Sequence, residues 1–199
     1  MDKESALRYC ELMKEVKYRV SAIKRILDGH CTLGFLPVNA EVVYLQFRKI
    51  LELIAYGSLV ANFKVYSSAR KDHLSEWHAS RFLRKIEALN PAFYPEPMAQ
   101  KEGYLPYTNL DLFTGNYLTR SEFETLYDIC GGFMHSENPY GDPHRYEELL
   151  QQSYGWLEKI VNLLNLHIVT FADGEEGCLI LMGGGEEVSF ATFGPPVQK

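Results

Sequence analysis

A histidine that follows a pair of glycines is the part of this sequence that points most directly to chemistry. Residues 130–140 read Cys-Gly-Gly-Phe-Met-His-Ser-Glu-Asn-Pro-Tyr and begin inside a segment with helical periodicity. Each glycine costs a helix about 1 kcal/mol relative to alanine, so the pair indicates that another element approaches closely there. His135 is expected at the C-terminal end of this helix, where unpaired carbonyls favour a protonated imidazole. Two interpretations follow: a capping histidine beside packing glycines, or a general acid–base group or phosphate contact.

A second candidate pair lies in an earlier, strongly apolar segment. Arg48 and Glu52 are spaced i, i+4, which puts their side chains on one face of a helix. Buried charges are seldom left unpaired. The pair is therefore either a self-contained ion pair at the edge of a helical bundle or the lining of a polar cleft that faces His135.

Other common site chemistries are not supported by the spacing of their residues. The six histidines form no His-Glu-x-x-His motif and the four cysteines no Cys-x-x-Cys motif, so we expect neither a metal site nor a cofactor. A phosphate-binding P-loop and a Gly-x-Ser-x-Gly nucleophile turn are also missing from the sequence. Cys130 and His135 would point about 140° apart on one helix, which disfavours a direct cysteine–histidine pair.

Five helical segments must position these residues. Apolar residues recur at intervals of three and four along each of them, and the predicted helices span residues 3–28, 40–66, 73–89, 120–136 and 143–165. The helix over 40–66 is apolar on most sides, which predicts that it is central, and Gly57 within it allows a close neighbour. Three of the helices have a predicted start signal. Asn39 is the expected N-cap of the second helix, a capping box from Thr119 to Glu122 opens the fourth, and the dipeptide Asp142-Pro143 opens the fifth.

The C-terminal part changes to the period of a β-strand. Three short strands are predicted over 166–171, 178–182 and 187–193, with glycine-containing turns between them. The expected fold is therefore mainly α, a bundle of about five helices with a small C-terminal antiparallel β-meander. We expect the bundle to occupy residues 1–165 and the strands, residues 166–199, to pack on it.

Residues 90–118 are unusually rich in proline, tyrosine and phenylalanine. The composition indicates an ordered loop pinned by aromatic side chains, with a short hairpin near Glu102-Gly103. Long loops in compact domains often serve function. A protein partner could bind this loop or the edge of the strand tail, and the loop's rings could line a pocket for a small ligand.

Charge is distributed unevenly along the chain, whose net charge is −6. Residues 1–120 hold 17 lysines and arginines against 13 acidic residues, whereas residues 121–199 hold 3 against 13. A polyanion such as RNA would therefore meet the first part more readily. The residues expected to hold an RNA backbone are Arg70, Lys71, Arg81, Arg84 and Lys85.

The sequence also predicts where the protein works. The longest apolar run, 42–60, is interrupted by Arg48, Lys49 and Glu52, so we expect no membrane span. Residues 1–4 lead into an amphipathic helix without the pattern of a signal peptide, and the four cysteines are scattered. We therefore expect a cytoplasmic protein with free thiols.

Two segments of the predicted helices, 47–52 and 131–135, together resemble the HEPN superfamily of bacterial and archaeal helical proteins. The residues that carry the resemblance are Phe-Arg-Lys-Ile-Leu-Glu at 47–52 and Gly-Gly-Phe-Met-His at 131–135, and it would extend over 1–165. Many members are metal-independent RNases of toxin–antitoxin, CRISPR and phage-defence systems, and others are non-catalytic interaction or RNA-binding modules. Dimers are common among them, so the resemblance implies RNA and a second copy of the chain as partners.

The resemblance implies a role for one residue, His135, which matches the family's catalytic histidine and would be the acid–base group. In the active version that we expect, Arg48 beside Glu52 neutralises the phosphate in place of the family's arginine, and Asn138 positions the phosphate. Catalytic members also carry an arginine separated from the histidine by four to six residues, and those positions here hold Cys130, Ile129 and Asp128. The missing arginine and the net negative charge favour the alternative expectation, which is a non-catalytic interaction module or a small-ligand-binding protein.

Overall fold

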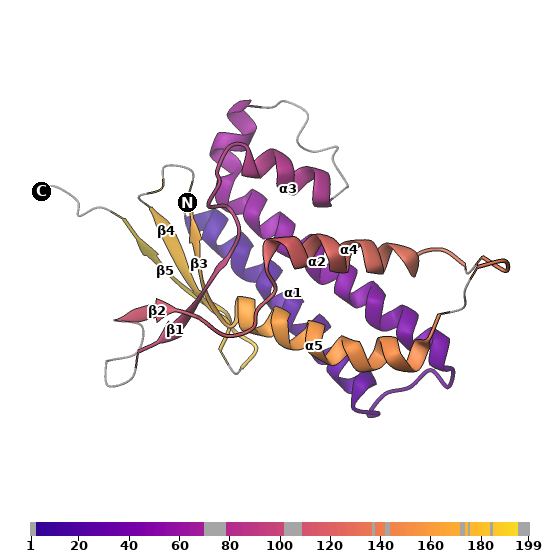
Figure 1. The fold of residues 1–199 in the computed structure, drawn as a ribbon. Coiled ribbons are helices and arrows are strands. Elements are labelled where there is room, and N and C mark those ends of the chain that lie inside the picture. The colour runs from indigo at the N-terminus through magenta and orange to yellow at the C-terminus, as the bar shows by residue number, and fades with distance from the viewer. Residues whose placement is uncertain are drawn as a thin grey trace, which may run out of the picture.

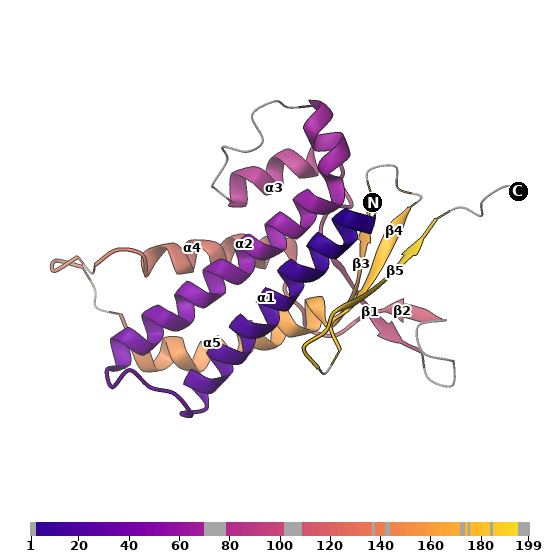
Figure 2. The same ribbon diagram turned by 180° about the vertical axis from the view of Figure 1, so that it is seen from behind.

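The structure is a computed structural model that describes residues 3–69, 79–101, 109–136, 138–141, 144–171, 174, 176–183 and 185–194. Its helices are α1 (Lys3–Leu27), α2 (Leu36–Ala69), α3 (Ala79–Glu87), α4 (Arg120–Gly132) and α5 (Tyr146–Leu164). Its strands are β1 (Glu96–Gln100), β2 (Leu110–Leu112), β3 (Leu166–Thr170), β4 (Gly177–Leu181) and β5 (Ser189–Phe193). In both views the sheet stands at the end of the helical bundle nearest the N-terminus of α1 (Figures 1 and 2). The predicted mainly α fold with an antiparallel sheet is confirmed.

Helix α2 is the centre of the bundle, as its apolar sequence predicts. It packs against all four other helices and against β3. Tyr44, Phe47 and Ile50 on this helix are completely buried. The close neighbour expected at Gly57 is the ring of Tyr9 on α1, since a Cβ at Gly57 would lie 2.9 Å from its Cε2 atom.

The start of α2 differs from the prediction. The helix begins at Leu36, so Asn39 lies in the first turn and is not the N-cap. Pro37 tolerates this early start because the first turn of a helix needs no N–H from it. The side chain of Asn39 instead holds the preceding loop, accepting a hydrogen bond from the amide of Leu33 (2.9 Å) and donating one to Thr32 Oγ1 (3.1 Å).

Three other boundaries were predicted with mixed success. The capping box of α4 is confirmed, with Thr119 and Glu122 exchanging side-chain and backbone hydrogen bonds. Helix α5 begins at Tyr146, so the predicted start at 143 is wrong, and Asp142 and Pro143 themselves lie outside the described residues. For the predicted helix over 73–89, the described part is α3, and residues 70–78 lie outside the description.

The sheet contains more than the three strands expected at the C-terminus. Its order is β2-β1-β3-β4-β5, and every pair is antiparallel. The predicted strands correspond to β3, β4 and β5, whereas β1 and β2 come from the aromatic segment 90–118. They form the expected hairpin, with Met98 opposite Leu112, although residues 102–108 at its turn are outside the description.

Buried polar groups join this sheet to the bundle. The amide of Asn90 donates to Asn62 Oδ1 on α2 (2.8 Å) and to the carbonyl of Thr170 on β3 (3.0 Å). His167 of β3 bonds through Nε2 to the hydroxyl of Tyr9 on α1 (2.8 Å). Because buried polar groups without partners are costly, these bonds fix how the two parts pack.

Candidate functional site

The candidate site is where α2 crosses the C-terminal half of α4. Arg48 donates a hydrogen bond from Nη2 to the hydroxyl of Tyr127 (2.7 Å), and its Cζ lies 4.1 Å from the centre of that ring. Its Nε is 3.3 Å from Glu52 Oε1, which confirms the predicted ion pair. The side chains of Arg48 and Glu52 are 21% and 28% exposed, so this charged group sits at the surface of the bundle and not in its core.

The glycine pair forms the last two residues of α4. Helix α4 ends at Gly132, so the prediction that it runs to residue 136 is wrong. The amides of Phe133 and Met134 donate to carbonyls three residues earlier, which tightens the last turn and ends the helix. A Cβ at Gly131 would lie 3.8 Å from Arg48 Nη1, whereas one at Gly132 would meet no atom within 4 Å. A Cβ would therefore fit at both positions, so the close approach expected at this pair is not found among the described residues, and the Arg48 guanidinium lies only at ordinary contact distance from Gly131.

His135 and Asn138 lie beyond the end of the helix on an exposed segment. His135 forms no hydrogen bond or ion pair within the described part of the chain, so it is not a capping residue. Asn138 accepts a hydrogen bond at Oδ1 from the amide of Tyr140 (3.0 Å), which leaves its side-chain amide group available to donate. The structure therefore does not support the capping interpretation, and the role of His135 as an acid–base group or phosphate contact stays a prediction.

A stack of aromatic rings, which sequence reasoning missed, positions this segment. Phe133 lies flat against Tyr44 of α2, with ring centres 4.2 Å apart, and its other neighbour is His144, at 5.0 Å. Tyr44 in turn donates from its hydroxyl to the carbonyl of Leu149 on α5 (3.2 Å). The stack therefore ties the connection between α4 and α5 to the central helix. Phe133 was visible in the sequence, but no local pattern indicates which ring it meets.

Cys130 has no role as a nucleophile in this arrangement. Its side chain is completely buried. Burial raises the pKa of the thiol to about 12, although the nearby Arg48 opposes the shift. A thiol with this pKa holds almost no thiolate at neutral pH, so it is unreactive. All four cysteines are free, as expected.

Two of the five expected RNA-binding residues, Arg84 and Lys85, have described side chains, and both lie away from His135. Arg70 and Lys71 are outside the described residues, and so is the side chain of Arg81 on α3. Arg84 and Lys85 are in the last turn of α3, beside the start of α4, and Arg84 Nε is 3.5 Å from Glu124 Oε1. His135 follows the opposite end of α4. The structure thus does not bring Arg84 and Lys85 together with His135.

Among the described histidines, the one whose pKa is shifted belongs to the core. His167 is completely buried, and its Nδ1 donates to the carbonyl of Leu164 (2.8 Å) while Nε2 accepts from Tyr9. Desolvation lowers the pKa of His167 to about 4, so the ring is neutral at pH 7. Because both nitrogens are satisfied and no solvent reaches them, this histidine is structural.

In the part of the chain that the structure describes, histidine, cysteine, aspartate and glutamate side chains form no cluster of three or more that could hold a metal ion. Within the same ranges, no helix is both long enough and apolar enough to cross a membrane.

Comparison of the chain with protein-family models, curated proteins and solved structures found no match. The assignment of function therefore rests on the residues and their geometry.

Proposed function

We propose that the chain is a HEPN-like protein that binds and cleaves RNA where α2 meets the C-terminal end of α4. The observation that supports this most is the position of Arg48, whose guanidinium reaches from α2 to Gly131, four residues before the exposed His135. A fixed cation and an unengaged histidine at one exposed end of a helix are suited to phosphodiester chemistry.

In the proposed reaction the nucleophile belongs to the RNA. His135 removes the proton of a ribose 2′-hydroxyl, and the oxygen then forms a bond to the adjacent phosphorus. The bond from phosphorus to the 5′ oxygen breaks, which leaves a 2′,3′-cyclic phosphate. The 5′ oxygen takes up a proton from solvent to become a hydroxyl, and His135 releases the proton that it removed. Because no metal ion enters these steps, the reaction should continue in a chelator.

Arg48 and Asn138 would act on the phosphate. The guanidinium of Arg48 offsets the charge that grows on the phosphate oxygens as the new bond forms. The free amide group of Asn138 can donate to the same oxygens. Glu52 keeps the guanidinium oriented through its ion pair with Arg48. We expect the reaction in the cytoplasm, and we expect the active protein to be a dimer.

The test is cleavage of labelled single-stranded RNA in excess EDTA. Wild-type protein is compared with His135→Ala and with a control variant, His30→Ala. The control removes another exposed histidine, which lies in the loop between α1 and α2. We expect His135→Ala to lose at least about 100-fold in rate, the usual contribution of acid–base catalysis, and His30→Ala to keep full activity. A substrate with 2′-deoxyribose at the cleaved position should resist. No cleavage by any protein, or equal cleavage by His135→Ala, would refute the proposed reaction.

One observation favours a second candidate function, a non-catalytic interaction module. Arg48 already bonds to Tyr127 and Glu52, so less of its charge is available to a phosphate. The surface offered to a protein partner would be β5, an exposed edge strand that pairs only with β4 among the described strands. In the same assay this candidate predicts a folded protein without RNase activity, and light scattering would show whether the partner is a second copy.

A further inference from the structure

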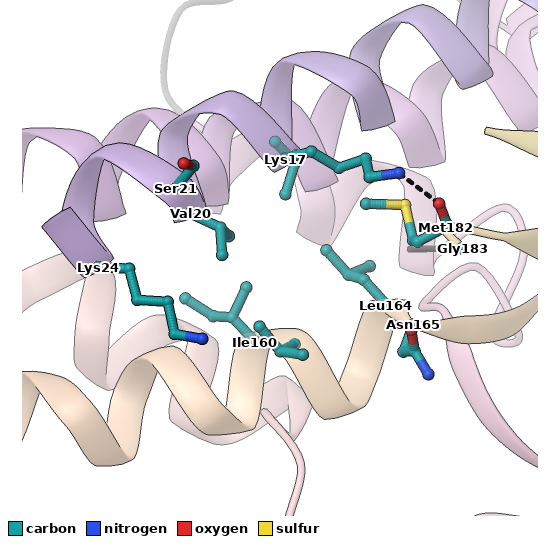
Figure 3. A pocket seen from close by; sticks show the side chains of 11 residues that line it. Lys17, Val20, Ser21, Lys24, Ile160, Leu164, Asn165, Met182 and Gly183 are labelled. Atoms are coloured by element: carbon teal, nitrogen blue, oxygen red, sulfur yellow. Dashed lines mark hydrogen bonds between the residues drawn. The ribbon is translucent and has the colours of Figure 1, made fainter. Parts of the chain in front are cut away.

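A cavity of about 390 Å³ lies between α1 and α5, where β4 leaves the sheet (Figure 3). Its volume is typical of sites for small molecules. A water-sized group occupies about 30 Å³, so the cavity has room for about a dozen non-hydrogen atoms. Its walls come from α1, α5 and the turn after β4, whereas the proposed RNA site is formed by α2 and α4. The two sites are therefore separate.

The floor of this cavity is apolar and fixed. Val16 of α1, Ile160 and Leu164 of α5, and Met182 after β4 line it, and all four belong to the buried core. Val20 of α1 adds a half-buried side chain at the same face. A hydrocarbon chain or a ring placed on this floor would cover the apolar surface that Val20 and the exposed Val161 of α5 still offer to solvent.

Charge at the cavity is entirely positive. Two of the residues that line it are lysines and none is acidic, although the chain as a whole is acidic. Lys17 is committed to the fold, because its amine donates to the carbonyls of Met182, Gly185 and Glu187. That clamp closes one end of the cavity, as Figure 3 shows for the bond to Met182.

Lys24 is the cation that remains for a ligand. It lies two helical turns after Lys17 and forms no hydrogen bond or ion pair with any residue in the described part of the chain. Figure 3 shows its amine extending beside Ile160, at the opposite end of the cavity from the Lys17 clamp. An unpaired ammonium next to apolar side chains is complementary to a carboxylate that ends a hydrocarbon chain.

We propose that this cavity binds a small amphipathic carboxylate, such as a medium-chain fatty acid or an aryl-substituted acid. Its hydrocarbon part lies on Val20, Val161 and Met182, and its carboxylate pairs with Lys24. This ligand is independent of the proposed RNA chemistry, so either proposal can fail without the other.

The test is isothermal titration with octanoate, octanamide and octylammonium, which share a chain and differ in charge. We expect octanoate to bind at one site per chain, octanamide to bind several-fold more weakly, and octylammonium not to bind. Lys24→Gln should weaken octanoate about threefold, the effect of losing an exposed ion pair, and leave octanamide unchanged. Arg25→Gln is the matched control, since Arg25 is next on α1 but does not line the cavity.

Filling the cavity provides an independent check. Val20→Trp should abolish octanoate binding, and Val161→Trp at the exposed rim of α5 is a second variant to use if Val20→Trp does not fold. Circular dichroism establishes that each variant is folded. Octylammonium binding as tight as that of octanoate, unchanged octanoate binding in a folded tryptophan variant, or no saturable octanoate binding by wild-type protein would each overturn the proposal.

Discussion

The contact between Arg48 and Tyr127 gives the sharpest test of how α2 and α4 are held together. We expect Arg48→Met, which keeps a long aliphatic side chain, to destabilise the protein, and Tyr127→Phe, which keeps the ring, to destabilise it less. The two substitutions should not be additive, because each removes the same 2.7 Å hydrogen bond.

The magnitude follows from the three interactions of the guanidinium. A hydrogen bond to a charged group contributes about 1.5–3 kcal/mol when it is buried, and the 21% exposure of Arg48 reduces this to about 1 kcal/mol. The contact with the ring of Tyr127 contributes about 0.5–1 kcal/mol, and the ion pair with Glu52 about 0.3–0.5 kcal/mol. Arg48→Met should therefore cost about 2 kcal/mol, Tyr127→Phe about 1 kcal/mol, and their coupling energy should be about 1 kcal/mol.

The assay is urea unfolding followed by circular dichroism for the wild type, both single variants and the double variant. Glu52→Gln is the matched control, with an expected loss of about 0.5 kcal/mol because it removes only the ion pair. A coupling energy indistinguishable from zero would refute the reasoning. It would mean that the guanidinium of Arg48 is not held by Tyr127 in solution and is free to meet a ligand.

Two further predictions concern the core. Gly57→Ala should destabilise the protein by about 1–3 kcal/mol, because the new Cβ would lie 2.9 Å from the ring of Tyr9. Gly155→Ala should instead stabilise α5 by about 0.5–1 kcal/mol, because its Cβ would meet no atom within 4 Å. Thermal unfolding of the two variants measures the difference. His167 should make stability sensitive to acid. Its pKa is about 4 in the folded protein against about 6.5 in the unfolded chain, so the unfolded chain binds more protons between these values and stability falls as the pH drops through them. Between pH 7 and about pH 4.5 the wild type should lose about 2 kcal/mol more than His167→Gln in urea titrations, and equal losses would contradict this.

Features that depend on local spacing were predictable from the sequence. Three such features are the apolar residues on most sides of α2, the i, i+4 pair of Arg48 and Glu52, and the capping box at Thr119. Each depends on residues within a few positions of one another. Such patterns predict geometry because a helix fixes which neighbours share a face.

Features that depend on distant residues were not predictable in the same way. The strands β1 and β2 join the C-terminal sheet only because β1 pairs with β3, and no local pattern in residues 90–118 indicates that partner. The end of α4 at Gly132 is accompanied by the stacking of Phe133 on Tyr44, another contact across the fold. The basic group on α3 looked available for RNA, yet Arg84 faces Glu124, which lies far along the chain.

The two residues of the proposed RNA site, Arg48 and His135, differ in what a mutation at each can reveal. Arg48 is bonded to Tyr127 and Glu52, so a substitution there changes stability and any activity together. His135 is exposed and forms no hydrogen bond or ion pair with the described residues, so His135→Ala should change the free energy of unfolding by less than about 0.5 kcal/mol. A loss of RNA cleavage in His135→Ala cannot then be attributed to unfolding. A substitution of His135 is therefore a clearer test of the proposed activity than a substitution of Arg48.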